Sequence, residues 1–185
     1  PCTYNFLLSK FDANGNHLWT KILSGSTGST DWNLGRSVQE TSDGGYIIAG
    51  KTMTASADHV ILYKLDANGN YQWGRSIGSC VYMGTNASVE QTSDGGYIVV
   101  SSPWFWSIYF GCLFSKFDAS GNHLWSKLLR FTAGYGTGPV SSVVQQTSDG
   151  GYIITVTLYP EGSTTDDIYL SKLDANINWE WTRVI

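Results

Sequence analysis

The chain has few charged residues, and this shortage excludes one large class of function. Charged side chains make up 14% of the 185 residues, against about 25% in an average globular domain. The formal net charge is −4 and no cluster of Lys or Arg occurs. The sequence therefore lacks the basic surface on which nucleic-acid binding depends, and we expect no nucleic-acid partner.

Cysteine is also scarce, with residues only at Cys2, Cys80 and Cys112. Three cysteines are too few for a disulfide framework, and their spacing does not match a metal site. Two alternatives stay open: a Cys80–Cys112 bridge that leaves Cys2 unpaired, or three buried thiols. We expect no metal and no cofactor.

The motifs of common enzyme classes are missing. The sequence has no Gly-x-Ser-x-Gly elbow and no glycine-rich phosphate loop, and these are the local signatures of hydrolases and nucleotide-binding enzymes. Acidic residues outside the repeated phrases are scattered and suggest no carboxylate pair for glycoside hydrolysis. His17, His59 and His123 show no metal-ligand spacing. We predict that the protein is not an enzyme.

Aromatic residues and glycines, in contrast, are plentiful. The chain holds 8 Trp, 11 Tyr and 21 Gly, a composition typical of strands joined by tight turns. The heptapeptide TSDGGYI occurs at 41–47, 92–98 and 147–153. A catalytic loop is normally needed once, so this repetition indicates architecture.

A second repeated phrase, of the form KLDANGN followed by Trp, alternates with the first. The aspartates of the two phrases are Asp43, Asp94 and Asp149, and Asp12, Asp66, Asp118 and Asp174. Equivalent aspartates recur at intervals of a little over fifty residues, and this period is close to that of four-stranded β-propeller blades. Asp-Gly-Gly and Asn-Gly are turn sequences, so all seven aspartates are predicted to be structural turn residues. The Asp-x-Asn-x-Asn pattern at Asp12 also resembles a calcium loop, but Leu23 stands where an EF-hand needs glutamate.

Each unit is predicted to hold four strands, which in the first full unit lie at 36–41, 45–52, 59–66 and 71–77. The expected fold is all-β: a β-propeller-like array of four-stranded antiparallel blades in one repeat domain spanning 1–185. It comprises an N-terminal half blade at 5–23 and three full blades at 36–77, 87–129 and 141–185.

The third strand of each unit is apolar on both faces apart from one lysine, as in CLFSKF at 112–117. A strand buried on both faces indicates sheets that pack against other sheets. The tryptophan that ends each second phrase is expected to fill this layer as structural core. These residues are Trp19, Trp73, Trp125 and Trp181.

Together the two phrases resemble a tandem repeat of secreted and surface proteins of bacteria and archaea. The repeat is best known from multidomain proteins exported by Bacteroidetes, where it is taken to form β-propellers. This resemblance covers nearly the whole chain and implies an extracellular or cell-surface location with a scaffold, adhesion or matrix role. It supplies no catalytic residues. The chain departs from the pattern in its aromatic segment at 103–110, in Ile177 at a turn-glycine position, and in the small number of repeats.

The aromatic segment lies in an uncharged stretch, 95–115, long enough to cross a bilayer of about 30 Å. It aligns with two strands and a loop of the repeat and contains Pro103, so we expect no membrane span. An apolar cluster at a blade tip usually marks a partner surface, although this loop can also fold over the core. The candidate partner-binding residues are Trp104, Phe105, Trp106, Ile108, Tyr109 and Phe110.

The half blade lacks two strands, which leaves three arrangements open: a small propeller of four blades, one of them two-stranded; an open arc completed by another subunit; or a fragment of a longer propeller. An unpaired hairpin edge is a template for another chain. The leading hypothesis is a non-enzymatic extracellular structural subunit. It self-assembles head-to-tail into a filament, matrix or surface layer through the incomplete blade and the aromatic loop. The alternative is a lectin-like, carbohydrate-binding propeller in which Trp32, Trp104 and Tyr135 stack on glycans. Asn86 opens an N-x-S sequon and is a candidate glycosylation site.

Overall fold

The computed structural model describes residues 5–23, 32–54, 58–80, 83–103, 111–130, 135–160 and 167–185. These residues form fourteen antiparallel strands in four sheets and no helix. The all-β prediction is confirmed. No helix in the described ranges could cross a membrane.

The chain forms a short hairpin followed by three four-stranded sheets, each with its strands in sequence order. The hairpin consists of β1 (Phe6–Phe11) and β2 (His17–Leu23). The second sheet holds β3 (Trp32–Glu40), β4 (Tyr46–Met53), β5 (Asp58–Leu65) and β6 (Tyr71–Cys80). The third holds β7 (Met83–Gln91), β8 (Tyr97–Pro103), β9 (Gly111–Phe117) and β10 (His123–Arg130). The fourth holds β11 (Tyr135–Gln146), β12 (Tyr152–Pro160), β13 (Asp167–Leu173) and β14 (Trp179–Val184). The four strands expected in the first full unit are confirmed, with small differences at their ends.

The TSDGGYI phrase closes the first hairpin of each four-stranded sheet. Asp43 Oδ1 accepts hydrogen bonds from Thr41 Oγ1 at 2.5 Å and from the Gly45 amide at 3.0 Å. Gly44 has a φ of 76°, a left-handed conformation that glycine adopts without steric cost. The same contacts form around the two later aspartates, Asp94 and Asp149.

The second phrase closes the last hairpin of every sheet in the same repetitive way. Asp66 Oδ1 accepts the amides of Asn68 and Asn70 at 2.9 and 2.8 Å. Equivalent bonds form at the other three turns, which begin at Asp12, Asp118 and Asp174. All seven repeated aspartates therefore lie at hairpin turns.

A lysine from each third strand fastens the two hairpins of a four-stranded sheet together. Lys64 Nζ lies 2.8 Å from Asp43 Oδ2, and its side chain is only 3% exposed. Lys116 and Lys172 contact Asp94 and Asp149 in the same way, each at 2.9 Å. The hydrogen bonds from Lys64 and Thr41 lower the pKa of Asp43 to about 2.

Acid should therefore weaken the fold in a defined range. Because the pKa of Asp43 is lower in the folded chain than its usual 3.8, its contribution to the free energy of unfolding is complete above about pH 4 and is lost as the pH falls toward 2. We expect the urea midpoint to decline over that range, and to decline less in a Lys64→Met variant. A natural chain whose midpoint is constant down to pH 2 would contradict this.

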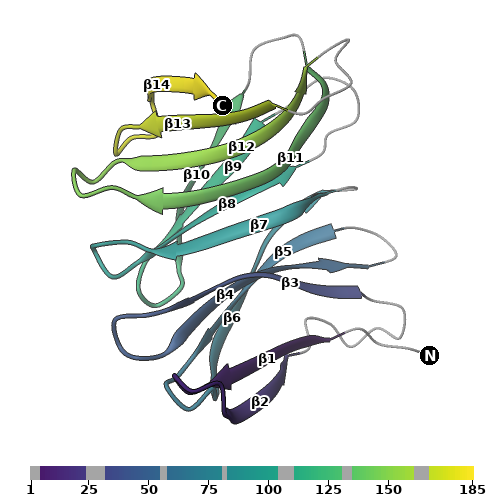
Figure 1. Cartoon of the computed structure of the whole chain (residues 1–185), viewed down its shortest axis with the longest axis vertical. Helices are drawn as coiled ribbons and strands as arrows, with labels where there is room; N and C mark the ends of the chain where they lie inside the picture. The colour runs from purple at the N-terminus through teal and green to yellow at the C-terminus, as the bar shows by residue number, and fades with distance from the viewer. Residues whose placement is uncertain are drawn as a thin grey trace.

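The sheets stack in chain order, with the two termini at opposite ends of the stack (Figure 1). Strand β7 packs against β3 and β4, and β11 packs against β7 and β8. The second sheet is buried on both faces: Ile47 of β4 lies in the core shared with the third sheet, whereas Ile48 lies in the core shared with the hairpin. This confirms the prediction of sheets packed on sheets. Among the described residues, no strand pairing joins the hairpin to the fourth sheet.

Candidate functional site

The structure describes only part of the residues that the sequence suggested for binding. All six residues of the aromatic loop lie outside the described residues, so their role stays a prediction. Trp32 begins β3 and is 48% exposed. Tyr135 begins β11, but its side chain is not among those described. Asn86 lies on β7 and is half-buried.

The structure distinguishes between the two alternatives for the cysteines, a Cys80–Cys112 bridge and three buried thiols. Cys112 is fully buried in the core between the third and fourth sheets and forms no disulfide. The Cys80–Cys112 bridge is therefore not formed, and the buried-thiol alternative holds for this residue. Cys2 lies outside the described residues.

Successive sheets are connected by a recurring contact, which we call the joint. In the joint between the second and third sheets, Trp73 of β6 covers the turn at Gly121, where a Cβ atom would lie 2.9 Å from the indole. Arg75 Nε donates to the Gly121 carbonyl at 2.6 Å, and another guanidinium nitrogen donates to the Ser120 carbonyl at 3.1 Å. The indole also meets Tyr97 edge-on at a centroid distance of 5.7 Å.

The other two joints have the same parts. Trp19 covers Gly69, where a Cβ atom would lie 3.0 Å from the ring, and Lys21 Nζ donates to Asn70 Oδ1 at 3.4 Å. Trp125 packs against the core that contains Ile177. The remaining contact of that joint comes from Lys127, whose Nζ donates to the Asn176 carbonyl at 2.8 Å and to Asn178 Oδ1 at 3.0 Å.

Sequence reasoning missed this joint as a unit, although a signal for it was present. A cation follows each repeated tryptophan by two positions, at Lys21, Arg75, Lys127 and Arg183. Each unit carries a Trp-x-Lys/Arg pattern in its last strand, and a tight turn follows one unit later. This spacing predicts that the tryptophan and the cation of one unit contact the turn of the next.

Side chains of Gln39, Gln91 and Glu90 add a second set of hydrogen bonds between sheets. The backbone N–H of Gln91 donates a hydrogen bond to Gln39 Oε1 at 2.6 Å, and the backbone N–H of Ser42 donates one to Gln91 Oε1 at 2.7 Å. One sheet further on, Glu90 accepts the amide of Gln146. These bonds fix the register of one sheet on the next.

The outer face of the fourth sheet exposes the parts of a joint, and no described sheet packs on them. Trp181 and Arg183 occupy the positions of Trp73 and Arg75, but Trp181 is 41% exposed, and the Arg183 guanidinium lies over its ring, 5.5 Å from the centroid. The expectation that Trp181 is core is corrected here, whereas Trp19, Trp73 and Trp125 are half-buried, and the last two pack against core clusters. The reason is that no described part of the chain covers the outer face of the fourth sheet at Trp181.

Other residues of that outer face are also more exposed than the residues at the same positions of the earlier sheets. Ile168 is 46% exposed, whereas Val60 and Cys112 at the same position of the earlier sheets are 2% and 0% exposed. Ile185 is 76% exposed, and its counterparts Ile77 and Leu129 are 8% and 5% exposed. The last sheet therefore presents an apolar face that the earlier sheets bury.

The N-terminal end exposes the complementary parts. Phe11 of β1 is 55% exposed, although Leu65, Phe117 and Leu173 at its position are 0 to 2% exposed. Leu7 on the same face is 69% exposed. At Gly15, in the turn of the first hairpin, an added Cβ atom would meet nothing within 4 Å. This turn lacks the indole that covers its counterparts.

The comparisons with known proteins do not assign the chain to a family. No protein-family model and no curated protein sequence matches it. Within the described part of the chain, no group of three or more His, Cys, Asp or Glu could hold a metal ion. The resemblance to the surface-protein repeat therefore stays a prediction from the two phrases.

Proposed function

We propose that the protein is a non-enzymatic structural subunit of an extracellular or cell-surface assembly, built of propeller-type blades and joined head-to-tail. The observation that carries this proposal is the pair of unmatched ends. The fourth sheet exposes an indole and a cation whose counterparts contact the turn of the following sheet at each earlier joint, a turn that holds Gly69, Gly121 or Ile177. The first hairpin exposes the turn at Gly15, which none of the described indoles covers.

In the proposed contact, the fourth sheet of one copy packs on the first hairpin of the next. Trp181 covers the turn at Gly15, and Arg183 donates to the carbonyls of that turn, as Arg75 does within the chain. Ile168 and Ile185 pack against Leu7 and Phe11. Because the two surfaces differ, the contact repeats and gives a ring or an open filament.

The energetics favour an assembly that depends on concentration. Burying an apolar side chain of this size stabilises by about 1.5–3 kcal/mol. The loss of freedom on association costs about 4–15 kcal/mol. Four apolar side chains and one indole therefore contribute a free energy of the same order as the cost of association, which is typical of an assembly that forms only above a certain concentration.

The contact can be tested by cross-linking two variants. Cys2 and Cys80 are first replaced by Ser, while the buried Cys112 is kept. One preparation then carries Asn14→Cys and the other carries Arg183→Cys. With a short bismaleimide reagent we expect a cross-linked dimer when the two are mixed, since the two residues lie together in the proposed contact.

Neither variant alone should give this dimer. The matched control replaces Arg183→Cys by Val184→Cys, a position that is 58% exposed on the opposite face of β14, and it should give little product. Equal yields from the two cysteine positions would contradict the proposed contact. A chain that carries both Asn14→Cys and Arg183→Cys and cross-links only within itself would indicate a closed ring of one copy.

Carbohydrate binding is the second candidate function, and one observation favours it. The exposed indole of Trp32 at the start of β3 offers the kind of flat surface on which a sugar ring stacks. A glycan array that shows binding lost on Trp32→Ala would support this function, whereas an array without hits would count against it.

A further inference from the structure

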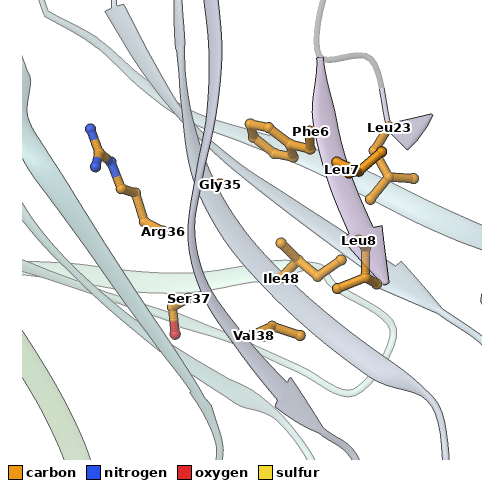
Figure 2. Close-up of a pocket in the computed structure, with 9 residues that line it drawn as sticks. All are labelled: Phe6, Leu7, Leu8, Leu23, Gly35, Arg36, Ser37, Val38 and Ile48. Atoms are coloured by element: carbon orange, nitrogen blue, oxygen red, sulfur yellow. The ribbon is translucent and has the colours of Figure 1, made fainter. Parts of the chain in front are cut away.

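A groove lies beside β1, on the side of the second sheet that faces the first hairpin. It encloses about 240 Å³ and is lined by Phe6 and Leu8 of β1, Val38 of β3 and Ile48 of β4. Figure 2 shows these side chains gathered around a common space between β1 and the second sheet. At the third and fourth sheets, the equivalent space is filled by the first two strands of the sheet before them: β3 and β4 pack against β7, and β7 and β8 pack against β11.

Val38, which lines the groove, is far more exposed than the residues at its position in the later sheets. Val89 and Val144 stand at the same position of the next two sheets and are 4% and 5% exposed, but Val38 is 53% exposed. Val89 packs with Ile47 and Ala49 of β4, the second strand of the preceding sheet. The first hairpin has no such strand, so Val38 has no equivalent cover.

The open edge of β1 gives the groove a second recognition element. β1 pairs only with β2, whereas β5, the equivalent strand of the second sheet, pairs with both β4 and β6. One edge of β1 therefore presents backbone amides and carbonyls that another strand can pair with.

Lys10 adds a positive charge next to the apolar groove and the open edge of β1. It stands at the position of Lys64, Lys116 and Lys172, each of which pairs with the aspartate of a TSDGGYI turn. Lys10 Nζ instead lies over the Tyr46 ring, 5.4 Å from its centroid. No carboxylate of the described residues forms an ion pair with it.

We propose that this groove binds a β-hairpin of the Thr-Ser-Asp-Gly-Gly-Tyr type carried by another polypeptide segment. The second strand of the incoming hairpin pairs with the open edge of β1. Its aspartate pairs with Lys10, and its apolar side chains cover Val38 and Ile48. A second folded copy is not the donor, because its three hairpins of this type are already paired within their own sheets.

The proposal does not depend on head-to-tail assembly. The groove lies between β1 and the second sheet, whereas the proposed contact between copies centres on the turn at Gly15 and on Phe11, and only Leu7 borders both. The two sites are tested with different residues, Lys10 for the groove and Trp181 and Arg183 for the contact between copies.

The test uses the full chain and a fluorescent synthetic peptide with the sequence of residues 87–103, which carries Asp94. We expect saturable binding by fluorescence anisotropy and slower hydrogen exchange of the β1 amides when peptide is present. Lys10→Met in the protein, or Asp94→Asn in the peptide, should each weaken binding about tenfold, as expected for a charged hydrogen bond. Lys10→Asp combined with Asp94→Lys should recover part of the loss.

Two controls make the outcome decisive. A scrambled peptide should not bind, and Lys127→Met, which removes a lysine far from the groove, should leave binding unchanged. The proposal is overturned if the natural peptide gives neither saturable binding nor protection of β1. It is also overturned if Lys10→Met binds as tightly as the natural chain.

Discussion

The double variant Trp181→Ala/Arg183→Glu should sediment as a 20.3 kDa monomer at concentrations where the natural chain forms larger species. The substitutions remove the indole that is expected to cover Gly15 of the next copy. They also place a carboxylate opposite backbone carbonyls that a cation would otherwise contact. Both residue types are those that dominate binding energy at protein interfaces.

The expected loss is large because the change acts at the centre of the proposed contact. Truncating one such residue costs at least about 2 kcal/mol, so the association constant should fall by about thirtyfold or more. The fold itself should not change, since Trp181 is 41% exposed and covers no later sheet. The urea midpoint of the monomer should stay close to that of the natural chain.

Val184→Ser is the matched control for this variant. Val184 neighbours both substituted residues and is 58% exposed, but its side chain lies on the opposite face of β14. This control should assemble like the natural chain. If the double variant assembles equally well, the contact between copies does not use the joint residues.

Phe114→Ala should lower the free energy of unfolding by about 3–5 kcal/mol. Phe114 of β9 is fully buried and lies in the core between the third and fourth sheets. Its removal leaves a cavity between two sheets that have little freedom to close it. Because each sheet in such an array depends on its neighbours, the loss should be felt across both.

Phe11→Ala provides the comparison within the same repeat pattern. Phe11 also belongs to a third strand, but it is 55% exposed at the N-terminal end of the stack. In urea titrations at a concentration where the chain is monomeric, its loss should change the free energy of unfolding by about 0.5 kcal/mol or less. Equal effects of the two substitutions would mean that the end of the stack is covered in solution.

The turns were the part of the fold most readily predicted from sequence. Asp-Gly-Gly and Asn-Gly restrict the chain locally, through positive φ angles and hydrogen bonds to the aspartate. These constraints act within a few residues, so the letters alone predict them. Ile177 shows how strong they are: it lacks the glycine, yet it adopts a φ of 60° and donates to the Asp174 carbonyl at 3.0 Å like its counterparts.

Burial at the two ends was less predictable, for a physical reason. Trp181 and Lys10 stand at the same positions of the repeat as Trp73 and Lys64, but their surroundings depend on whether a neighbouring sheet is present. A repeated phrase predicts which contact a residue is able to make. Only the arrangement in space shows which copies of that contact are complete, and the incomplete copies are the candidate sites of this chain.

The central claim, that the protein assembles through its two ends, is tested most directly by sedimentation velocity of the natural chain over a range of concentrations, with negative-stain images of the same samples. The account predicts species larger than 20.3 kDa that grow with concentration, and rings or filaments in the images. Particles that stay at 20.3 kDa at every concentration would contradict it.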